Sequence, residues 1–200
     1  MLSSLINRLI GLFFLILYSP LILIIAIWIK IDSPGNIIFS QTRIGKNKKP
    51  FTFYKFRTMW IDANERFPEL YEYDYTENEI KNMKFKVAND PRVTKAGFYL
   101  RKISLDELPN LINVVRGDMN LVGPRPEIPE MIRYYEPWQM KKFTIKPGIT
   151  GLAQTNGRGN LTFQETIEYD LNYIDKRNIL LDFYIFWRTL LVVIKSIGAF

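Results

Sequence analysis

Residues 9–29 read LIGLFFLILYSPLILIIAIWI, a stretch of 21 residues without a charged side chain. About 20 apolar residues suffice to cross the hydrocarbon core of a bilayer. The stretch is too long for a secretory signal peptide, and no small-residue cleavage site follows it. A domain of this size could hardly cover such a helix on all sides. We therefore predict that residues 1–32 insert into a membrane and that residues 33–200 form a membrane-associated domain.

Ser19 and Pro20 lie in the middle of this apolar stretch. Proline removes one backbone hydrogen bond and clashes with the preceding turn, so we predict a sharp bend there. Two topologies accommodate the bend: a kinked helix that spans the membrane, and a re-entrant helix that enters one leaflet and returns. We favour the re-entrant form, because a break at mid-segment lets both halves stay in one leaflet and both ends face the same side.

The composition of the 200 residues limits which kinds of catalytic and metal site the protein can form. Hydrophobic residues make up 48% of the chain and charged residues 24%, which suits a globular enzyme and a peripheral membrane protein equally. The chain has no Cys and no His. Their absence excludes disulfide scaffolds, thiol nucleophiles, Ser-His triads and His metal sites. Any catalysis must use carboxylates, Lys, Arg, Tyr, Ser or Thr, with or without an oxygen-ligated cation.

The net charge of +7 suits an anionic partner, and the charge is unevenly spread. Residues 1–60 hold eight Lys and Arg against one acid, whereas residues 61–90 hold eight acids against four bases. Basic residues therefore gather directly after the apolar stretch, which favours anionic lipid headgroups over nucleic acid as the partner. The excess of Lys and Arg after residue 29 also predicts a cytoplasmic position for the main domain.

The rest of the chain predicts an α+β fold that is mostly helical. Residues 36–59 contain two runs rich in β-branched and aromatic residues around the polar turn GKNKKP, which indicates a small β-hairpin. Residues 61–90 are polar, acidic and rich in tyrosine, and we expect a surface excursion with some helix. The predicted helices of the domain, the second of them ended by Gly117, are 98–102, 106–116, 133–142 and 162–175.

The last stretch, residues 178–200, is apolar but carries Asp182, Arg188 and Lys195. These charges disfavour a second membrane span and favour an amphipathic helix that lies in the membrane interface. An ordinary core helix is the alternative.

Residues 101–126, RKISLDELPNLINVVRGDMNLVGPRP, concentrate unusual chemistry. Asp106 and Glu107 are adjacent at a predicted helix start, where neighbouring side chains point about 100° apart, so they suit two separate roles. A structural alternative is a capping box between Ser104 and Glu107, in which Glu107 serves only backbone donors. Pro109 weakens that alternative, because it removes a backbone hydrogen bond in the first turns of the helix.

A helix start also favours a bound phosphate, through its free N–H groups and its dipole. Arg101, and Arg125 held between Pro124 and Pro126, could supply forked donors to phosphate oxygens. The alternative for each arginine is a solvated surface position, which is less common for an arginine fixed by flanking prolines beside a carboxylate pair.

With these motifs the chain resembles the bacterial sugar transferase family, the small monotopic phosphoglycosyl transferases. The similarity runs over nearly the whole chain in the family's order and spacing, and the chain is similar to the minimal catalytic form. The matching stretches are the apolar helix with Ser19-Pro20, YKFRTM at 54–59, SLDELPNLINVVRGDMNLVGPRP at 104–126, and KPGITGLAQTNGR at 146–158.

The resemblance implies transfer of a sugar-1-phosphate from a UDP-sugar to polyprenyl (undecaprenyl) phosphate, with release of UMP. This would be the first membrane step in the assembly of a capsule, O-antigen, exopolysaccharide or glycoprotein glycan at the bacterial inner membrane. It further implies that Asp106 attacks the β-phosphorus to form a covalent phosphosugar-aspartyl intermediate, and that Glu107 binds Mg²⁺. A carboxylate nucleophile needs no His, and two steps let a soluble and a lipid substrate use one site in turn.

By the same resemblance, Arg101 and Arg125 contact phosphate, while Lys55, Arg158 and Asp170 line or order the site. The alternative for Lys55 is a basic strand face, and for Asp170 a helix-surface acid paired with Lys or Arg. Leu152 stands where the family commonly has tryptophan, and Thr155 where it has valine, which weakens any inference about the sugar.

Two other functions are compatible with part of these sequence features. A non-catalytic lipid-binding membrane scaffold would need the apolar helix and the basic cluster, but not SLDELP with PRP. A glycosyltransferase that moves only the sugar to polyprenyl phosphate would release UDP rather than UMP. The expected partners are therefore a UDP-sugar, polyprenyl phosphate and membrane lipids, without nucleic acid, and a homodimer is one compatible assembly.

Overall fold

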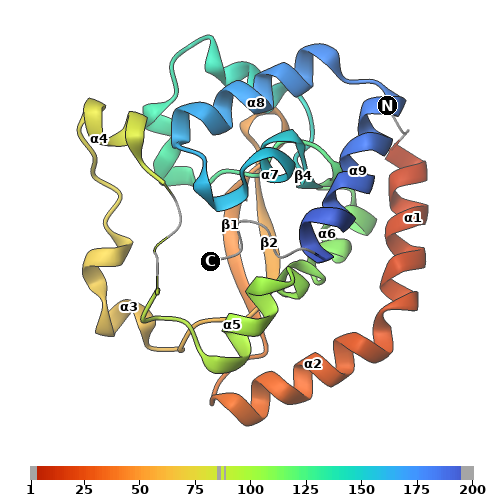
Figure 1. The fold of residues 1–200 in the computed structure, drawn as a ribbon, viewed down its shortest axis with the longest axis vertical. Coiled ribbons are helices and arrows are strands. Elements are labelled where there is room, and N and C mark those ends of the chain that lie inside the picture. The colour runs from red at the N-terminus through yellow and green to blue at the C-terminus, as the bar shows by residue number, and fades with distance from the viewer. Residues whose placement is uncertain (1–3, 85–86, 88, 195–200) are drawn as a thin grey trace.

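The computed structural model describes residues 4–84, 87 and 89–194 (Figure 1). These residues are mostly helical with two small sheets, which confirms the predicted α+β class. The strands are β1 (Ile38–Ile44), β2 (Pro50–Phe56), β3 (Asn120–Val122) and β4 (Gly148–Thr150). The α-helices are α1 (Ser4–Leu17), α2 (Ser19–Asp32), α3 (Ala63–Arg66), α4 (Glu77–Asn82), α5 (Lys95–Lys102), α6 (Asn110–Arg116), α7 (Leu152–Asn156), α8 (Phe163–Lys176) and α9 (Ile179–Ile194).

The apolar N-terminal stretch forms two helices, α1 and α2, that are bent by 61° where they meet. Pro20 lies in the first turn of α2, and the Ser19 hydroxyl donates a 2.8 Å hydrogen bond to the Ile16 carbonyl. The predicted sharp bend is therefore confirmed. Within the described part of the chain no single helix is both long and apolar enough to cross a membrane. Taken together, α1 and α2 reach the length and the apolar composition of a span. The bend suits a broken span and a re-entrant loop alike.

One face of each N-terminal helix packs on the rest of the molecule (Figure 1). Asn7 of α1 accepts a 2.9 Å hydrogen bond from the Leu121 N–H of β3, and Arg8 donates to the Arg116 carbonyl at the end of α6. Ile25 and Ile29 of α2 are buried together with Leu100 of α5. The outward faces expose large apolar side chains, among them Leu5, Leu9, Phe13, Ile16, Leu23, Ile24, Ile27 and Ile31.

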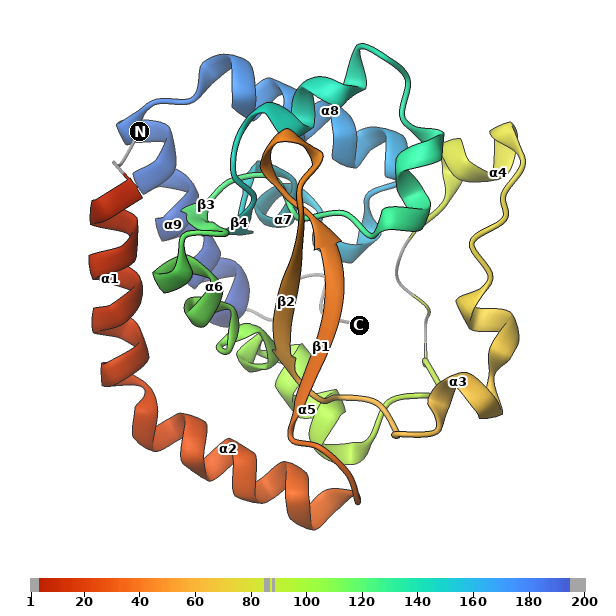
Figure 2. The same cartoon turned by 180° about the vertical axis from the view of Figure 1, so that it is seen from behind.

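The predicted hairpin is confirmed, with β1 and β2 antiparallel in a register that runs from Ile38 opposite Phe56 to Ile44 opposite Pro50. It crosses the middle of the molecule in front of the other elements in Figure 2. Arg57, directly after β2, donates hydrogen bonds to the carbonyls of Ser33 and Asn36. The base of the hairpin is therefore fixed to the C-terminal end of α2.

A second small sheet, the parallel pair β3 and β4, was not predicted. It joins the GPRP loop to the segment around residue 148, because Gly148 N–H donates to the Pro124 carbonyl and Gly123 N–H donates to the Thr150 carbonyl, both at 2.9 Å. A Cβ on Gly148 would lie 2.1 Å from the nitrogen of Gly123, so this close approach requires glycine. The backbone that carries Arg125 is thus set by a distant part of the chain.

Two predicted helices are wrong. The range 106–116 is not one helix, because a 3-10 turn over Leu105–Glu107 is followed by α6, which begins only after Pro109. The range 133–142 is replaced by two 3-10 helices, Pro129–Tyr134 and Gln139–Thr144, on either side of Pro137. In both cases a proline lacks the N–H that a continuous helix would need. The predicted end of α6 at Gly117 is confirmed, since this residue has a φ of 88°.

The other helix predictions hold. The range 98–102 lies within α5, which Thr94 caps, and 162–175 corresponds to α8, where Thr162 and Glu165 form a capping box. The described part of residues 61–90 contains α3, a 3-10 turn over Pro68–Tyr71 and α4.

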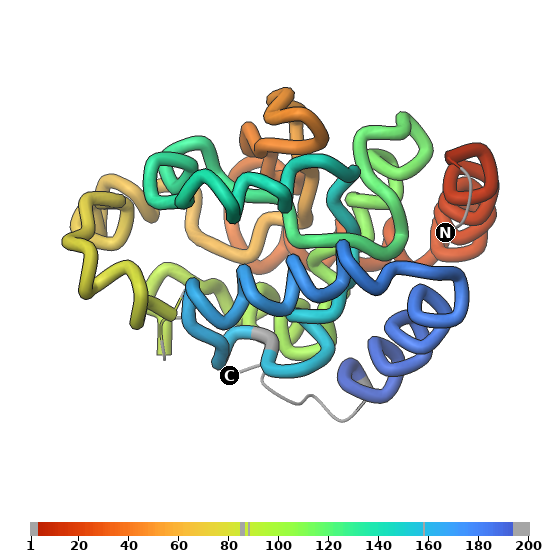
Figure 3. The backbone as a smooth tube through the Cα atoms, turned by 90° about the horizontal axis from the view of Figure 1, so that it is seen from above, coloured from red at the N-terminus to blue at the C-terminus, as the bar shows by residue number. Residues whose placement is uncertain are grey.

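The C-terminal helix α9 is not an internal core helix. It buries Ile185 and Asp182, but Leu180, Phe183 and Trp187 are exposed. In Figure 3, α8 and α9 lie on the side of the molecule away from the hairpin turn. The interfacial position of α9 stays a prediction, and Lys195 falls outside the described residues.

Candidate active site

The carboxylate pair lies on the 3-10 turn between α5 and α6. Ser104 enters this turn with a left-handed φ of 56°, and its side chain makes no capping hydrogen bond there. The capping-box alternative is therefore wrong. Asp106 is only 6% exposed, and the Glu107 side chain is 18% exposed. A buried carboxylate with a partly buried one next to it requires cations close by, because an unpaired charge is costly to bury.

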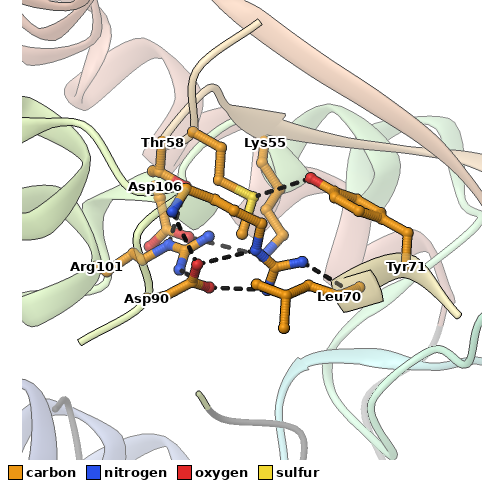
Figure 4. A network of polar contacts seen from close by, with 9 residues as sticks. Lys55, Thr58, Leu70, Tyr71, Asp90, Arg101 and Asp106 are labelled. Carbon is orange, nitrogen blue, oxygen red and sulfur yellow. Dashed lines mark hydrogen bonds and ion pairs between the residues drawn. The ribbon is translucent and has the colours of Figure 1, made fainter. Parts of the chain in front are cut away.

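Lys55 of β2 supplies one of these cations. Its Nζ lies 3.7 Å from Asp106 Oδ2 and 3.9 Å from Glu107 Oε1. The side chain is 20% exposed and turns toward the carboxylates rather than toward solvent (Figure 4). Lys55 is therefore part of the same cluster as the predicted catalytic pair, and is not simply the basic face of a strand.

The two arginines singled out from the sequence also lie here, in different environments. Arg125 Nη1 donates a 2.8 Å hydrogen bond to Glu107 Oε1. Arg101 of α5 lies beside Asp106 in Figure 4, where its Nε donates to Thr58 Oγ1 at 2.9 Å and its Nη1 lies 3.8 Å from Asp90 Oδ2. The cluster thus joins β2, α5, the 3-10 turn and the GPRP loop.

Burial shifts the acid–base properties of this cluster. It raises the pKa of Asp106 above its ordinary value, and Glu107 adds to the rise while Lys55 opposes it. Burial lowers the pKa of Lys55, against the opposing pull of the two carboxylates. Asp106 is therefore more basic than an exposed aspartate and still has a cation in contact, a combination that suits a carboxylate nucleophile.

Asp170 does not join this cluster in the described structure. Asp170 of α8 is fully buried and forms an ion pair of 3.2 Å with Lys142, so the surface-acid alternative is wrong although the lysine partner is right. Lys142 Nζ also lies 3.4 Å from Glu127 Oε2, which accepts a 2.8 Å hydrogen bond from the Tyr135 hydroxyl. Arg158 begins a 3-10 turn, and its side chain falls outside what the structure describes.

Five further charged residues were not predicted. Arg43, Asp90 and Arg92 lie close to this cluster, and Glu127 and Lys142 form a separate buried group with Asp170. The predicted hairpin contained a signal for Arg43, because strand alternation puts it on the same face as Lys55. Glu127 and Lys142 carried no such signal, since a buried ion pair between distant residues has no local sequence pattern.

Comparison with known proteins identifies the family. Residues 1–196 match the bacterial sugar transferase family, so the chain belongs to it. The galactosyl transferase CpsE of Streptococcus agalactiae is 43% identical over 82% of this chain. The exopolysaccharide production protein ExoY of Rhizobium meliloti is 36% identical over 93% of it, and the UDP-glucose:undecaprenyl-phosphate glucose-1-phosphate transferase of Escherichia coli is 40% identical over 88%.

The share of each relative's length that this chain matches differs. It spans 36% of the length of CpsE and of the Escherichia coli transferase, and 82% of the length of ExoY. The motifs of the candidate active site therefore lie in a region that is shared between long and short members of the family.

The buried ion pairs of Lys142 give the first testable prediction. Replacing Lys142 with Met leaves Glu127 and Asp170 buried without their cation, and we expect the free energy of unfolding to fall by about 3–5 kcal/mol near neutral pH. Burial raises the pKa of Asp170 to about 6, so its ionised form increasingly disfavours the folded state as the pH rises from about 4 through 6. The loss in free energy of unfolding of Lys142→Met relative to wild type should therefore be smaller at about pH 5 than near neutral pH.

Denaturant unfolding in detergent micelles, at about pH 7.5 and pH 5, measures this effect. The neighbouring Lys141→Met is the matched control, because Lys141 is exposed and pairs with the exposed Asp175. We expect the control to change stability by less than about 0.5 kcal/mol. Equal losses in the two variants would contradict a structural role for the buried lysine.

Proposed function

We propose that this protein transfers a sugar-1-phosphate from a UDP-sugar to polyprenyl phosphate and releases UMP, as an early membrane step of polysaccharide assembly. The buried Asp106 carboxylate, next to Glu107 and in contact with Lys55, is the observation that carries the proposal. Membership of the bacterial sugar transferase family supports it, as do the names of the relatives, which specify glucose-1-phosphate transfer to undecaprenyl phosphate and exopolysaccharide production.

The proposed reaction proceeds in two displacements at one phosphorus atom. A carboxylate oxygen of Asp106 attacks the β-phosphorus of the UDP-sugar, the bond from that phosphorus to the bridging oxygen breaks, and UMP leaves with the oxygen. A phosphate oxygen of polyprenyl phosphate then attacks the same phosphorus and expels the Asp106 carboxylate. The raised basicity of Asp106 favours the first attack, and Lys55 and Arg125 offset the charge of the diphosphate.

We further propose that Glu107, with Asp106 beside it, binds Mg²⁺ together with substrate phosphate. Within the described residues no three carboxylates come together, so a metal cage made of protein alone is not present. The pair still fits Mg²⁺, because this ion keeps several waters and needs only one or two carboxylates when phosphates supply further ligands. When bound, Mg²⁺ supplies charge neutralisation at the reacting phosphate.

A Mg²⁺ titration tests the role of Glu107. We expect Glu107→Gln to raise the Mg²⁺ concentration for half-maximal UMP release by at least about tenfold, because one charged ligand is lost. The exposed Glu130→Gln serves as the control and should leave the titration unchanged. A Glu107→Gln protein with lower thermal stability but an unchanged Mg²⁺ requirement would show that Glu107 is structural only.

Covalent modification tests the role of Asp106. With a UDP-sugar alone, wild-type protein should gain the mass of one phosphosugar on a peptide that contains Asp106. Asp106→Asn should form no adduct and release UMP at least about 10³-fold more slowly, because the nucleophile is gone. Asp175→Asn, an exposed aspartate of α8, should behave like wild type. Turnover near the wild-type rate in Asp106→Asn would exclude this mechanism.

The same assay separates the alternative functions. A panel of UDP-sugars with polyprenyl phosphate is scored for the nucleotide released. UMP supports the proposed transfer of sugar-1-phosphate, whereas UDP would identify a glycosyltransferase that moves only the sugar. Release of neither nucleotide across the panel, with retained lipid binding, would favour the non-catalytic scaffold.

We also propose that α1 and α2 form a re-entrant loop at the bacterial inner membrane, with the catalytic domain on the cytoplasmic face. The 61° bend, the Ser19 hydrogen bond to Ile16 and the apolar outward faces of both helices fit this topology and a broken span alike. The inner faces pack on α6 and β3 and on α5, which keeps both helices against the domain.

Cysteine labelling tests the topology in a chain that has no cysteine of its own. We expect Ser4→Cys, at the start of α1, to react with a membrane-impermeant reagent only after the inner membrane is opened. Lys48→Cys, on the hairpin turn, is the cytoplasmic control in either topology. Labelling of Ser4→Cys from the periplasmic side of intact spheroplasts would establish a true span instead.

A further inference from the structure

Arg43 of β1 is a charged residue that the proposed mechanism does not yet use. In the hairpin register Arg43 lies opposite Phe51, and Lys55 lies opposite Phe39. Since alternate pairs share a face, Arg43 and Lys55 lie on the same face of the hairpin. The contacts agree, because Arg43 Cζ lies 5.5 Å from the centre of the Phe53 ring and Lys55 Nζ lies 5.8 Å from it.

The guanidinium of Arg43 lies against the loop that carries Arg125. Its Nη1 donates a 3.3 Å hydrogen bond to the Pro126 carbonyl, in the loop that carries Arg125. Its Nε is buried and has no hydrogen-bond partner among the described residues. The described residues therefore do not use the full donor capacity of this guanidinium, which carries five N–H groups.

No carboxylate is available to Arg43 as an ion-pair partner. Among the described residues none lies within ion-pair distance of it, and the two nearby glutamates have other partners. Glu107 is bound to Arg125, and Glu127 contacts Lys142 and Tyr135. Burial and the repulsion from Arg125 lower the pKa of Arg43 to about 10, so it stays charged at neutral pH.

We propose that Arg43, together with Arg125, forms a phosphate-binding subsite next to the carboxylate pair. A phosphate offsets the repulsion between the two arginines, and the planar guanidinium suits its oxygens. The inference rests on the proposed function for the identity of the phosphate, which is either that of the nucleotide or that of the polyprenyl phosphate.

Binding measurements on the full chain in detergent, with Mg²⁺ present, test this subsite. UMP and a short polyprenyl phosphate are titrated separately by calorimetry. Arg43→Gln should weaken binding of one of the two by about 10–100-fold, the loss expected for a charge-assisted hydrogen bond. Arg43→Lys should lose most of the same affinity, because lysine keeps the charge but not the planar fork.

Arg116→Gln is the matched control. Arg116 also lies over an aromatic ring of β2, with its Cζ 5.2 Å from the centre of the Tyr54 ring, but Tyr54 is on the opposite face of the hairpin from Phe53. This variant should bind both ligands like wild type. Far-UV circular dichroism and thermal unfolding establish that each variant is folded. If Arg43→Gln does not fold, Arg43→Lys provides the same comparison.

The binding results distinguish a nucleotide phosphate from a polyprenyl phosphate at the subsite, and they test the subsite separately from the proposed function. Weaker UMP binding alone assigns the subsite to the nucleotide phosphate, and weaker lipid binding alone assigns it to the polyprenyl phosphate. Unchanged affinity for both ligands in a folded Arg43 variant overturns the subsite. If wild-type protein forms no adduct with any UDP-sugar but still binds phosphate through Arg43, the proposed function fails while the subsite stands.

Discussion

Burial of the Asp106 carboxylate, with the partly buried Glu107 next to it, is the constraint on which the arrangement of the molecule depends. A buried charge is tolerated only when cations and hydrogen bonds compensate it. The turn that carries the pair offers no cation of its own, so the fold must bring Lys55 from the hairpin and Arg125 from the GPRP loop. The hairpin register and the β3–β4 pairing are what hold those two side chains in reach.

The N-terminal helices are coupled to this site through packing. Helix α1 packs against α6, which begins shortly after the carboxylates, and α2 packs against α5, which carries Arg101. The segment predicted to enter the membrane thus contacts both helices that flank the 3-10 turn with the carboxylates. Under the proposed transfer to polyprenyl phosphate, this arrangement would keep the site close to the headgroup region in which that substrate lies.

The GPRP segment joins two groups of charges. Arg125 points to the carboxylate pair, while Glu127, two residues later, reaches the interior and contacts Lys142. Arg43 contacts the same segment through the Pro126 carbonyl. Both groups of charges therefore meet at one short segment, which is stiffened by Pro124 and Pro126.

The sequence alone determined the features that depend on local patterns. The apolar stretch with its central proline predicted the bent helix pair. Two runs of β-branched and aromatic residues around a polar turn predicted the hairpin, and the motif around Asp106 indicated the candidate site. The sequence could not determine which prolines interrupt a predicted helix, as Pro109 and Pro137 do. Whether a helix continues through a proline depends on the tertiary contacts around it.

Only the tertiary structure decided which charges meet. Asp170 was expected at the site, yet it pairs with Lys142 in the interior, and Arg43 was not expected at all. Ion pairs and the parallel β3–β4 pairing join residues that are far apart in the chain, so no window of sequence contains both partners. The physical reason is that desolvation, which shifts the pKa of Asp106 and Lys55, is a property of the packed interior and not of the residues themselves.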